Sequence, residues 1–157
     1  MMRDSVKDPL EKIKRYCAYQ ERSHFEVKNK LYSFGLPTSR VEAFVATLIE
    51  ENYLNEERFA ISFARGKFML KKWGRVKIKY ELGLKRVGAA NIKTSLKEIN
   101  EEDYRQMIQN LVEKKWDALV GEDTFSRQAK TVQYLLQKGY ELPLVQQALK
   151  NIKDKIS

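Results

Sequence analysis

The residues of this chain that could support covalent chemistry are few. Cys17 is the only cysteine and His24 the only histidine. On one continuous helix they would lie on the same face, two turns apart, where a histidine could activate a thiol nucleophile. The simpler interpretation is that Cys17 completes an apolar stripe while His24 lies at the surface or caps a helix. A single cysteine also excludes an internal disulfide framework and a cysteine-based zinc site.

The acidic residues come in adjacent pairs, which is a poor arrangement for an active site. Glu50–Glu51, Glu56–Glu57 and Glu101–Glu102 are such pairs. Neighbouring residues of a helix point about 100° apart, so their carboxylates do not converge on one metal ion or substrate. Acidic residues at the start of a helix, where they favour its dipole, explain most of them. We therefore predict a protein without enzymatic activity, metal site or cofactor.

Positive charge, in contrast, is concentrated in the middle of the chain. Residues 1–57 carry 9 basic and 10 acidic side chains, residues 58–99 carry 12 and 2, and residues 100–157 carry 9 of each. The whole net charge of +9 therefore lies in the middle segment. One basic block between balanced neighbours indicates a positioned electrostatic surface, suited to a nucleic acid or a nucleoprotein.

The most cationic part of this block, Lys71–Arg75, is predicted to join two helices. Backbone amides at the start of the next helix would then add to the cationic side chains in binding phosphate. Trp73 could stack on an exposed base, although packing between helices is the simpler role for it. A single lysine is usually no more than part of a solvated helix face, so the prediction concerns the set as a whole. Its members are Arg58, Arg65, Lys67, Lys71, Lys72, Trp73, Arg75, Lys77 and Lys79.

An internal repeat places this block in the fold. Three segments read alike, with equivalent apolar anchors separated by 51 and then 53 residues, and each leucine anchor is followed ten residues later by a Val or Ile anchor. Such self-similarity is typical of stacked helical repeats, which serve as binding surfaces. The anchors are Leu31, Leu82 and Leu135, followed by Val41, Ile92 and Val145.

The ends of the predicted helices agree with the repeat. Four residues after each leucine anchor come Gly35, Arg86 and Gly139. Glycine suits the left-handed turn after a helix, whereas Arg86 must adopt that turn at a cost of about 1 kcal/mol or form a different one. Asn55 and Asn100 are expected to cap the helices that follow them.

We therefore predict an all-α fold in which three tandem three-helix repeats form an elongated, curved array. The expected repeats are residues 1–54, residues 55–99, which include the basic block, and residues 100–157. No apolar run is long enough to cross a membrane, and Met1–Leu10 is too charged for a secretory signal. These features favour a soluble, cytoplasmic monomer.

The centre of the sequence resembles the RecX family. The resemblance follows a tyrosine–leucine–acidic stretch within Glu50–Glu57, the helix start Arg58–Ala60 with Phe63 after it, a turn spanning Lys71 to Gly74, and an arginine-led helix from Arg75 to Glu81–Leu82. The sequence departs from the family pattern at Asn55–Glu56, where two aspartates are common, and at Arg86, where the turn glycine is common. The flanking segments agree with the family in spacing, so the resemblance covers nearly the whole chain.

This resemblance implies a regulator of the RecA recombinase. Proteins of this family are arrays of three helical units that bind the RecA–single-stranded DNA filament in its groove. They are not enzymes, and they restrain filament assembly, ATP hydrolysis and strand exchange. Two alternatives remain open from the residues alone: a helical-repeat nucleic-acid-binding protein that acts without a recombinase, and an adaptor array whose basic face is incidental.

Overall fold

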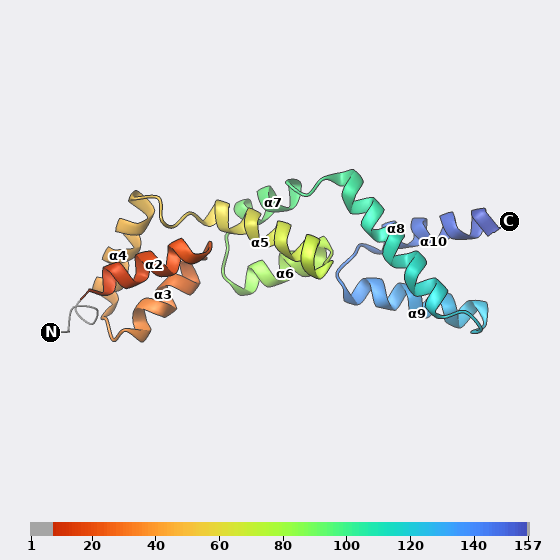
Figure 1. The fold of residues 1–157 in the computed structure, drawn as a ribbon, viewed down its shortest axis with the longest axis horizontal. Coiled ribbons are helices and arrows are strands. Elements are labelled where there is room, and N and C mark those ends of the chain that lie inside the picture. The colour runs from red at the N-terminus through yellow and green to blue at the C-terminus, as the bar shows by residue number, and fades with distance from the viewer. Residues whose placement is uncertain (1–7, 157) are drawn as a thin grey trace. The chain divides into compact units, whose positions relative to one another are not determined.

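The computed structural model describes residues 8–156, and this part of the chain is helical with no strand (Figure 1). The residues outside it, 1–7 and 157, include most of the Met1–Leu10 stretch considered above. The all-α fold of three-helix repeats is confirmed. Its helices are α2 (Pro9–Tyr19), α3 (His24–Ser33), α4 (Thr38–Glu50), α5 (Glu56–Lys71), α6 (Arg75–Leu84), α7 (Ala89–Lys97), α8 (Glu101–Ala118), α9 (Thr124–Gln137) and α10 (Leu142–Ile156).

The predicted anchors form the core. Leu31, Leu82 and Leu135 are each 0% exposed. The second set of anchors, Val41, Ile92 and Val145, is also buried. Because the same positions are buried in each repeat, the 51- and 53-residue spacing reflects a repeated helical hairpin and not a chance likeness of sequence.

The predicted helix ends are also confirmed. Gly35, Arg86 and Gly139 all have positive φ, at 83°, 62° and 97°. Arg86 therefore adopts the left-handed turn despite its Cβ, and the Val87 amide donates to the Leu82 carbonyl across it, at 3.1 Å. The turn geometry is thus set by the repeat and not by glycine alone.

Asparagine side chains cap two of the helices, as the sequence predicts. The Asn55 side chain accepts a hydrogen bond from the Arg58 amide at 2.9 Å, and Asn100 accepts one from the Asp103 amide at 2.8 Å. Each cap satisfies an amide that has no partner within its own helix. These caps fix the starts of α5 and α8.

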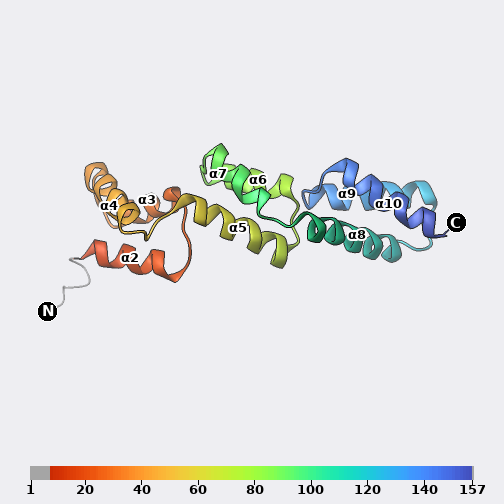
Figure 2. The same ribbon diagram turned by 90° about the horizontal axis from the view of Figure 1, so that it is seen from above.

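The described chain forms two compact units. The first contains residues 8–63 and 82–95, and the second contains residues 64–81 and 96–156. In the first unit α3 packs against both α2 and α4, and its core comprises Ile13, Cys17, Val27, Leu31, Val41, Val45, Leu48 and Leu54. In the second unit α8, α9 and α10 pack together, as Figures 1 and 2 both show. The middle segment of the sequence contributes to both units, and the division into repeats 1–54, 55–99 and 100–157 stays a prediction.

Candidate nucleic-acid interface

The predicted junction between α5 and α6 is present. α5 ends at Lys71 and α6 begins at Arg75. Between them Lys72 adopts a left-handed conformation with φ of 59°, and the Trp73 amide donates to the Lys67 carbonyl at 3.1 Å. Of the nine predicted residues, Arg58 belongs to the first unit and the other eight belong to the second.

The amides at the start of α6 are not available to a phosphate. The Gly74 amide donates to the Lys138 carbonyl at 2.8 Å, and the Val76 amide donates to the Gly139 carbonyl at 2.9 Å. Between them, the Arg75 amide donates to the Tyr104 hydroxyl, also at 2.9 Å. The expectation that these amides bind phosphate is therefore wrong, because the α9–α10 turn and α8 occupy them.

We call this contact, between the start of α6 and the α9–α10 turn with α8, the second junction because it joins the second and third repeats. It requires glycine at two positions. A Cβ on Gly74 would lie 2.3 Å from the Gly139 oxygen, and a Cβ on Gly139 would lie 2.4 Å from the Lys77 Cβ. Real Cβ atoms do not approach other atoms so closely, so the two backbone segments touch only because both side chains are absent. Lys77 is thereby held against the α9–α10 turn.

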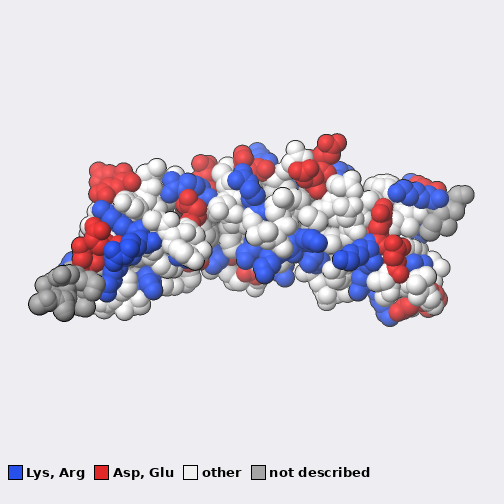
Figure 3. Space-filling view, viewed as in Figure 1, with Lys and Arg blue, Asp and Glu red and all other residues white. Residues whose placement is uncertain are grey.

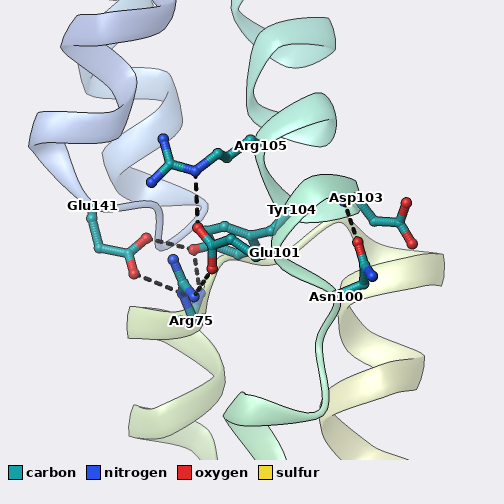
Figure 4. A network of polar contacts seen from close by, with 7 residues as sticks. All are labelled: Arg75, Asn100, Glu101, Asp103, Tyr104, Arg105 and Glu141. Atoms are coloured by element: carbon teal, nitrogen blue, oxygen red, sulfur yellow. Dashed lines mark hydrogen bonds and ion pairs between the residues drawn. The ribbon is translucent and has the colours of Figure 1, made fainter.

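Arg75 is held by carboxylates of its own unit (Figure 4). Its Nε lies 2.8 Å from Glu141 Oε2, and its Nη1 lies 3.1 Å from Glu101 Oε1. Its guanidinium lies 3.9 Å from the centre of the Tyr104 ring, and the Tyr104 hydroxyl donates to Glu141 at 2.5 Å. The charge of Arg75 is matched within the fold, so its place in the structure is that of a tether between α6, α8 and the start of α10.

The shifts in pKa agree with this arrangement. Burial opposes the charge on Arg75, but Glu141 and Glu101 outweigh it and raise its pKa. The hydrogen bond from Arg75 lowers the pKa of Glu101. Burial raises the pKa of Tyr104, which keeps its hydroxyl protonated and able to donate to Glu141.

Arg58 is likewise engaged within its own unit. Its Nε lies 2.6 Å from Glu21 Oε2, and its two terminal nitrogens donate to the side-chain and backbone oxygens of Asn52, each at 3.1 Å. These contacts fix the α4–α5 loop. Like Arg75, Arg58 therefore has protein partners for its guanidinium group, which engage three of its five N–H donors.

Trp73 lies among cationic side chains. It is half-buried, and the ammonium groups of Lys67 and Lys77 lie 5.1 and 4.7 Å from its ring. An ammonium group at this distance from an indole ring is attracted by the negative face of the ring. The tryptophan thus orients two of the predicted lysines.

Sequence reasoning missed Lys138, which lies beside these residues. Burial lowers its pKa, and the positive charges of Lys77 and Lys72 lower it further. Its Nζ donates to the Lys71 carbonyl at 3.4 Å. We call Lys72, Lys77 and Lys138 the lysine cluster; within the described residues none of the three forms an ion pair with a carboxylate.

Lys138 could have been found from the repeat. It precedes the turn residue Gly139 as Lys85 precedes Arg86, so it occupies a junction position. Its segment has no net charge, however, and a search for charge blocks passes over it. The remaining predicted residues, Arg65, Lys71 and Lys79, are exposed. On the face drawn in Figure 3, Lys and Arg side chains gather over the region of α6, whereas both signs mix over α2–α4.

The other candidate for chemistry does not form a site in the described chain. Cys17 is buried, and burial raises the pKa of its thiol, which disfavours the nucleophilic thiolate. The His24 Nδ1 instead lies 3.8 Å from Glu56. Among the described residues there is no group of three or more His, Cys, Asp or Glu side chains placed to hold a metal ion. None of the described helices is long and apolar enough to span a membrane.

Comparison with known proteins agrees with the repeat architecture. The model of the second three-helix domain of RecX matches residues 55–96, and that of the third matches residues 101–149. Proteins named "Regulatory protein RecX" from Bacillus cereus strain AH820 and Bacillus thuringiensis subsp. konkukian are each 27% identical over 139 residues. That alignment covers 88% of this chain but only 52% of each relative, so the chain spans about half the length of these curated relatives.

Two solved structures share the fold. The crystal structure of RecX from Lactobacillus salivarius has a TM-score of 0.86 at 21% identity, covering 97% of this chain and 99% of the other. A second structure, of regulatory protein RecX, has a TM-score of 0.80 at 21% identity and covers 93% and 74% of the two chains. With both domain models matched in order and the fold shared, the chain belongs to the RecX family of regulatory proteins.

Proposed function

We propose that this protein binds the RecA–single-stranded DNA filament and restrains its assembly, ATP hydrolysis and strand exchange. The observation that carries the proposal is the lysine cluster at the second junction. Membership of a family of regulatory proteins supports a role that works by binding and without catalysis. The identity of the filament as the target follows from the family resemblance.

The lysine cluster is suited to an anion because no carboxylate of residues 8–156 forms an ion pair with its three lysines. Placing Lys138 beside Lys72 and Lys77 opposes its protonation. A phosphate group between them would replace this repulsion with attraction and release counterions from the nucleic acid. An anionic partner would therefore relieve an electrostatic cost that the fold carries at Lys138.

Trp73 has a positioning role in this proposal. Two ammonium groups lie over its ring, so a base that stacks there would have to displace Lys67 or Lys77. We assign to Trp73 the task of holding these lysines toward the phosphates. The exposed side chains of Arg65, Lys71 and Lys79 add longer-range attraction, which speeds association at low salt.

The test is DNA-dependent ATP hydrolysis by RecA from the same organism, with this protein added below the RecA concentration. We expect inhibition, because a bound regulator restrains more than one filament subunit. Unchanged ATP hydrolysis at near-physiological salt would overturn the proposal.

A second candidate is a nucleic-acid-binding protein that acts without a recombinase. The same lysine cluster favours it, since phosphate can be bound whether or not RecA is present. Binding of a fluorescent oligo(dT) at increasing salt, with and without RecA, separates the two. The filament proposal predicts tighter binding to RecA-coated than to naked DNA, whereas equal or tighter binding to naked DNA favours the second candidate.

A further inference from the structure

A groove in the third repeat lies between α9 and α10, and its lining residues do not belong to the lysine cluster. It encloses about 600 Å³ between α9 and α10. Phe125, Ala129 and Val132 line it from α9, and Leu149, Lys150 and Lys153 line it from α10. The α9 residues are spaced four and three apart, and the α10 residues follow Gln146 at positions i+3, i+4 and i+7, so each helix contributes one continuous face. A groove between two helices with such faces fits a third helix.

The equivalent faces of the first and second repeats show what this face contacts in those repeats. By the 53-residue spacing, Phe125, Gln128 and Ala129 correspond to Lys72, Arg75 and Val76. Those three positions contact the repeat that follows: the Lys72 carbonyl accepts from Tyr140, Arg75 binds Glu101 and Glu141, and the Val76 amide donates to Gly139.

The corresponding residues of the first repeat do the same. Glu21, His24 and Phe25 contact Arg58, Glu56 and Arg86. In the third repeat this face is open, with the Phe125 side chain 84% exposed. The start of α9 is nevertheless capped within its own segment, because the Asp123 side chain accepts a hydrogen bond from the Ser126 amide.

The charge of the groove selects the partner. Two of its eight lining residues are lysines and none is acidic. In the first repeat, Lys12 and Lys30 lie over the Phe34 ring, so the surface around that ring also presents positive charge. Docking of a second copy of this chain through that surface would bring like charges together. An occupant with carboxylates is favoured instead.

We propose that the α9–α10 groove binds an acidic amphipathic helix of a partner protein. Its apolar residues, spaced three or four apart, would cover Phe125, Val132 and Leu149, while its carboxylates would face Lys150 and Lys153. This surface is separate from the lysine cluster and does not depend on the function proposed for it. It gives the regulator a protein contact in addition to an anion contact.

The test uses a designed peptide of about 20 residues, long enough to form a helix in water, with leucine at helical spacing, glutamate along both flanks and alanine elsewhere. Binding to the full chain is measured by fluorescence anisotropy and located by ¹H–¹⁵N NMR. We expect shifts confined to α9 and α10. The variants Ala129→Glu and Lys150→Glu, both at exposed positions, should weaken binding about tenfold.

The matched control is Lys114→Glu, which makes the same charge change at an exposed position of α8 outside the groove. It should bind the peptide as the unaltered protein does. A peptide with lysine in place of glutamate should not bind. Equal binding of both peptides, NMR shifts away from α9 and α10, or concentration-dependent self-association through the groove would each overturn the proposal.

Discussion

The two junctions between successive repeats use the same helical frame with different chemistry. At the first, α3 caps itself: the Ser23 side chain accepts from the Glu26 amide, and the Glu26 side chain accepts from the Ser23 amide. At the second junction, the residue equivalent to Ser23 is Gly74, which has no side chain to cap α6. The carbonyls of Lys138 and Gly139 accept the α6 amides instead. The second junction thus joins two repeats through backbone contacts, where the first uses a local cap.

The side chains at equivalent positions differ in sign. At the first junction Lys85 lies 2.9 Å from Glu26 and forms an ion pair. The 51- and 53-residue spacings place Lys77 where Glu26 stands and Lys138 where Lys85 stands. An attractive pair in one junction is therefore a repulsive pair in the other. We infer that the repeat preserves geometry and that the second junction has given up its internal charge balance for an external anion.

The aromatic and cationic partners are exchanged in the same way. At the first junction the Arg22 guanidinium lies 3.7 Å from the Tyr16 ring. The equivalent positions at the second are Trp73 and Lys67, so the ring now occupies the later position and the cation the earlier one. Both junctions therefore pair an aromatic ring with a cation, but at the second junction the cation is a lysine beside the lysine cluster.

The largest effect should come from a methyl group at the second junction. Gly139→Ala must place a Cβ 2.4 Å from the Lys77 Cβ in a left-handed conformation, and we expect a loss of about 3 kcal/mol or more. Gly35→Ala, the equivalent change in the first repeat, meets no atom within 4 Å and should cost only about 1 kcal/mol. Urea denaturation measures both, and equal losses would contradict the close backbone approach.

Removal of the Arg75 tether should have the next largest effect. Arg75→Met leaves Glu141 without its cation in a half-buried position and should cost about 2 kcal/mol in the free energy of unfolding. The double variant Arg75→Met with Glu141→Gln should recover part of this loss, because the uncompensated charge is gone. A loss below about 0.5 kcal/mol, as is typical of exposed ion pairs, would show that Arg75 is not a tether.

Opposite signs are expected for the two equivalent lysines. Lys85→Met removes an ion pair and should lower stability by about 0.5 kcal/mol. Lys138→Met removes a charge that burial and two lysines disfavour, and it should raise stability by a similar amount. Thermal denaturation of both variants in low-phosphate buffer makes the comparison. A destabilised Lys138→Met would mean that the lysine cluster is not strained.

Acid should produce the smallest effect. The pKa of Glu101 is lowered in the folded protein, so its interaction with Arg75 stabilises the fold above the ordinary glutamate pKa of 4.5 and disappears as the pH falls through the lowered value. Glu101→Gln should therefore show a shallower decline in melting temperature below pH 4.5 than the unaltered protein. Parallel declines would show that Glu101 does not contribute to acid sensitivity.

Local features of this fold could be predicted from the sequence. The anchors Leu31, Leu82 and Leu135, the caps Asn55 and Asn100, and the strained turn at Arg86 each depend on residues a few positions apart. The α5–α6 junction is predictable for the same reason. Short-range periodicity and capping determine such features before tertiary contacts form.

Long-range features could not be predicted in this way. The α6 amides are occupied by Lys138 and Gly139, more than 60 residues along the chain, and no local pattern indicates that interaction. From the sequence alone, Arg75 is predicted to contact a binding partner. It binds Glu101 and Glu141 instead, and these lie 26 and 66 residues further along the chain, too far for a local pattern to indicate the contact. Knowledge of the basic block alone thus overstates the number of cations that can reach a partner.

The most direct test of the central claim compares two triple variants in the RecA ATPase assay. One replaces the lysine cluster, Lys72, Lys77 and Lys138, by alanine. The other removes the same charge from exposed positions elsewhere, through Arg15→Ala, Arg40→Ala and Lys114→Ala. We expect the first to abolish inhibition and to flatten the salt dependence, by roughly 0.7 for each phosphate that is no longer bound. We expect the second to inhibit normally; equal inhibition by both variants would contradict the role of the lysine cluster.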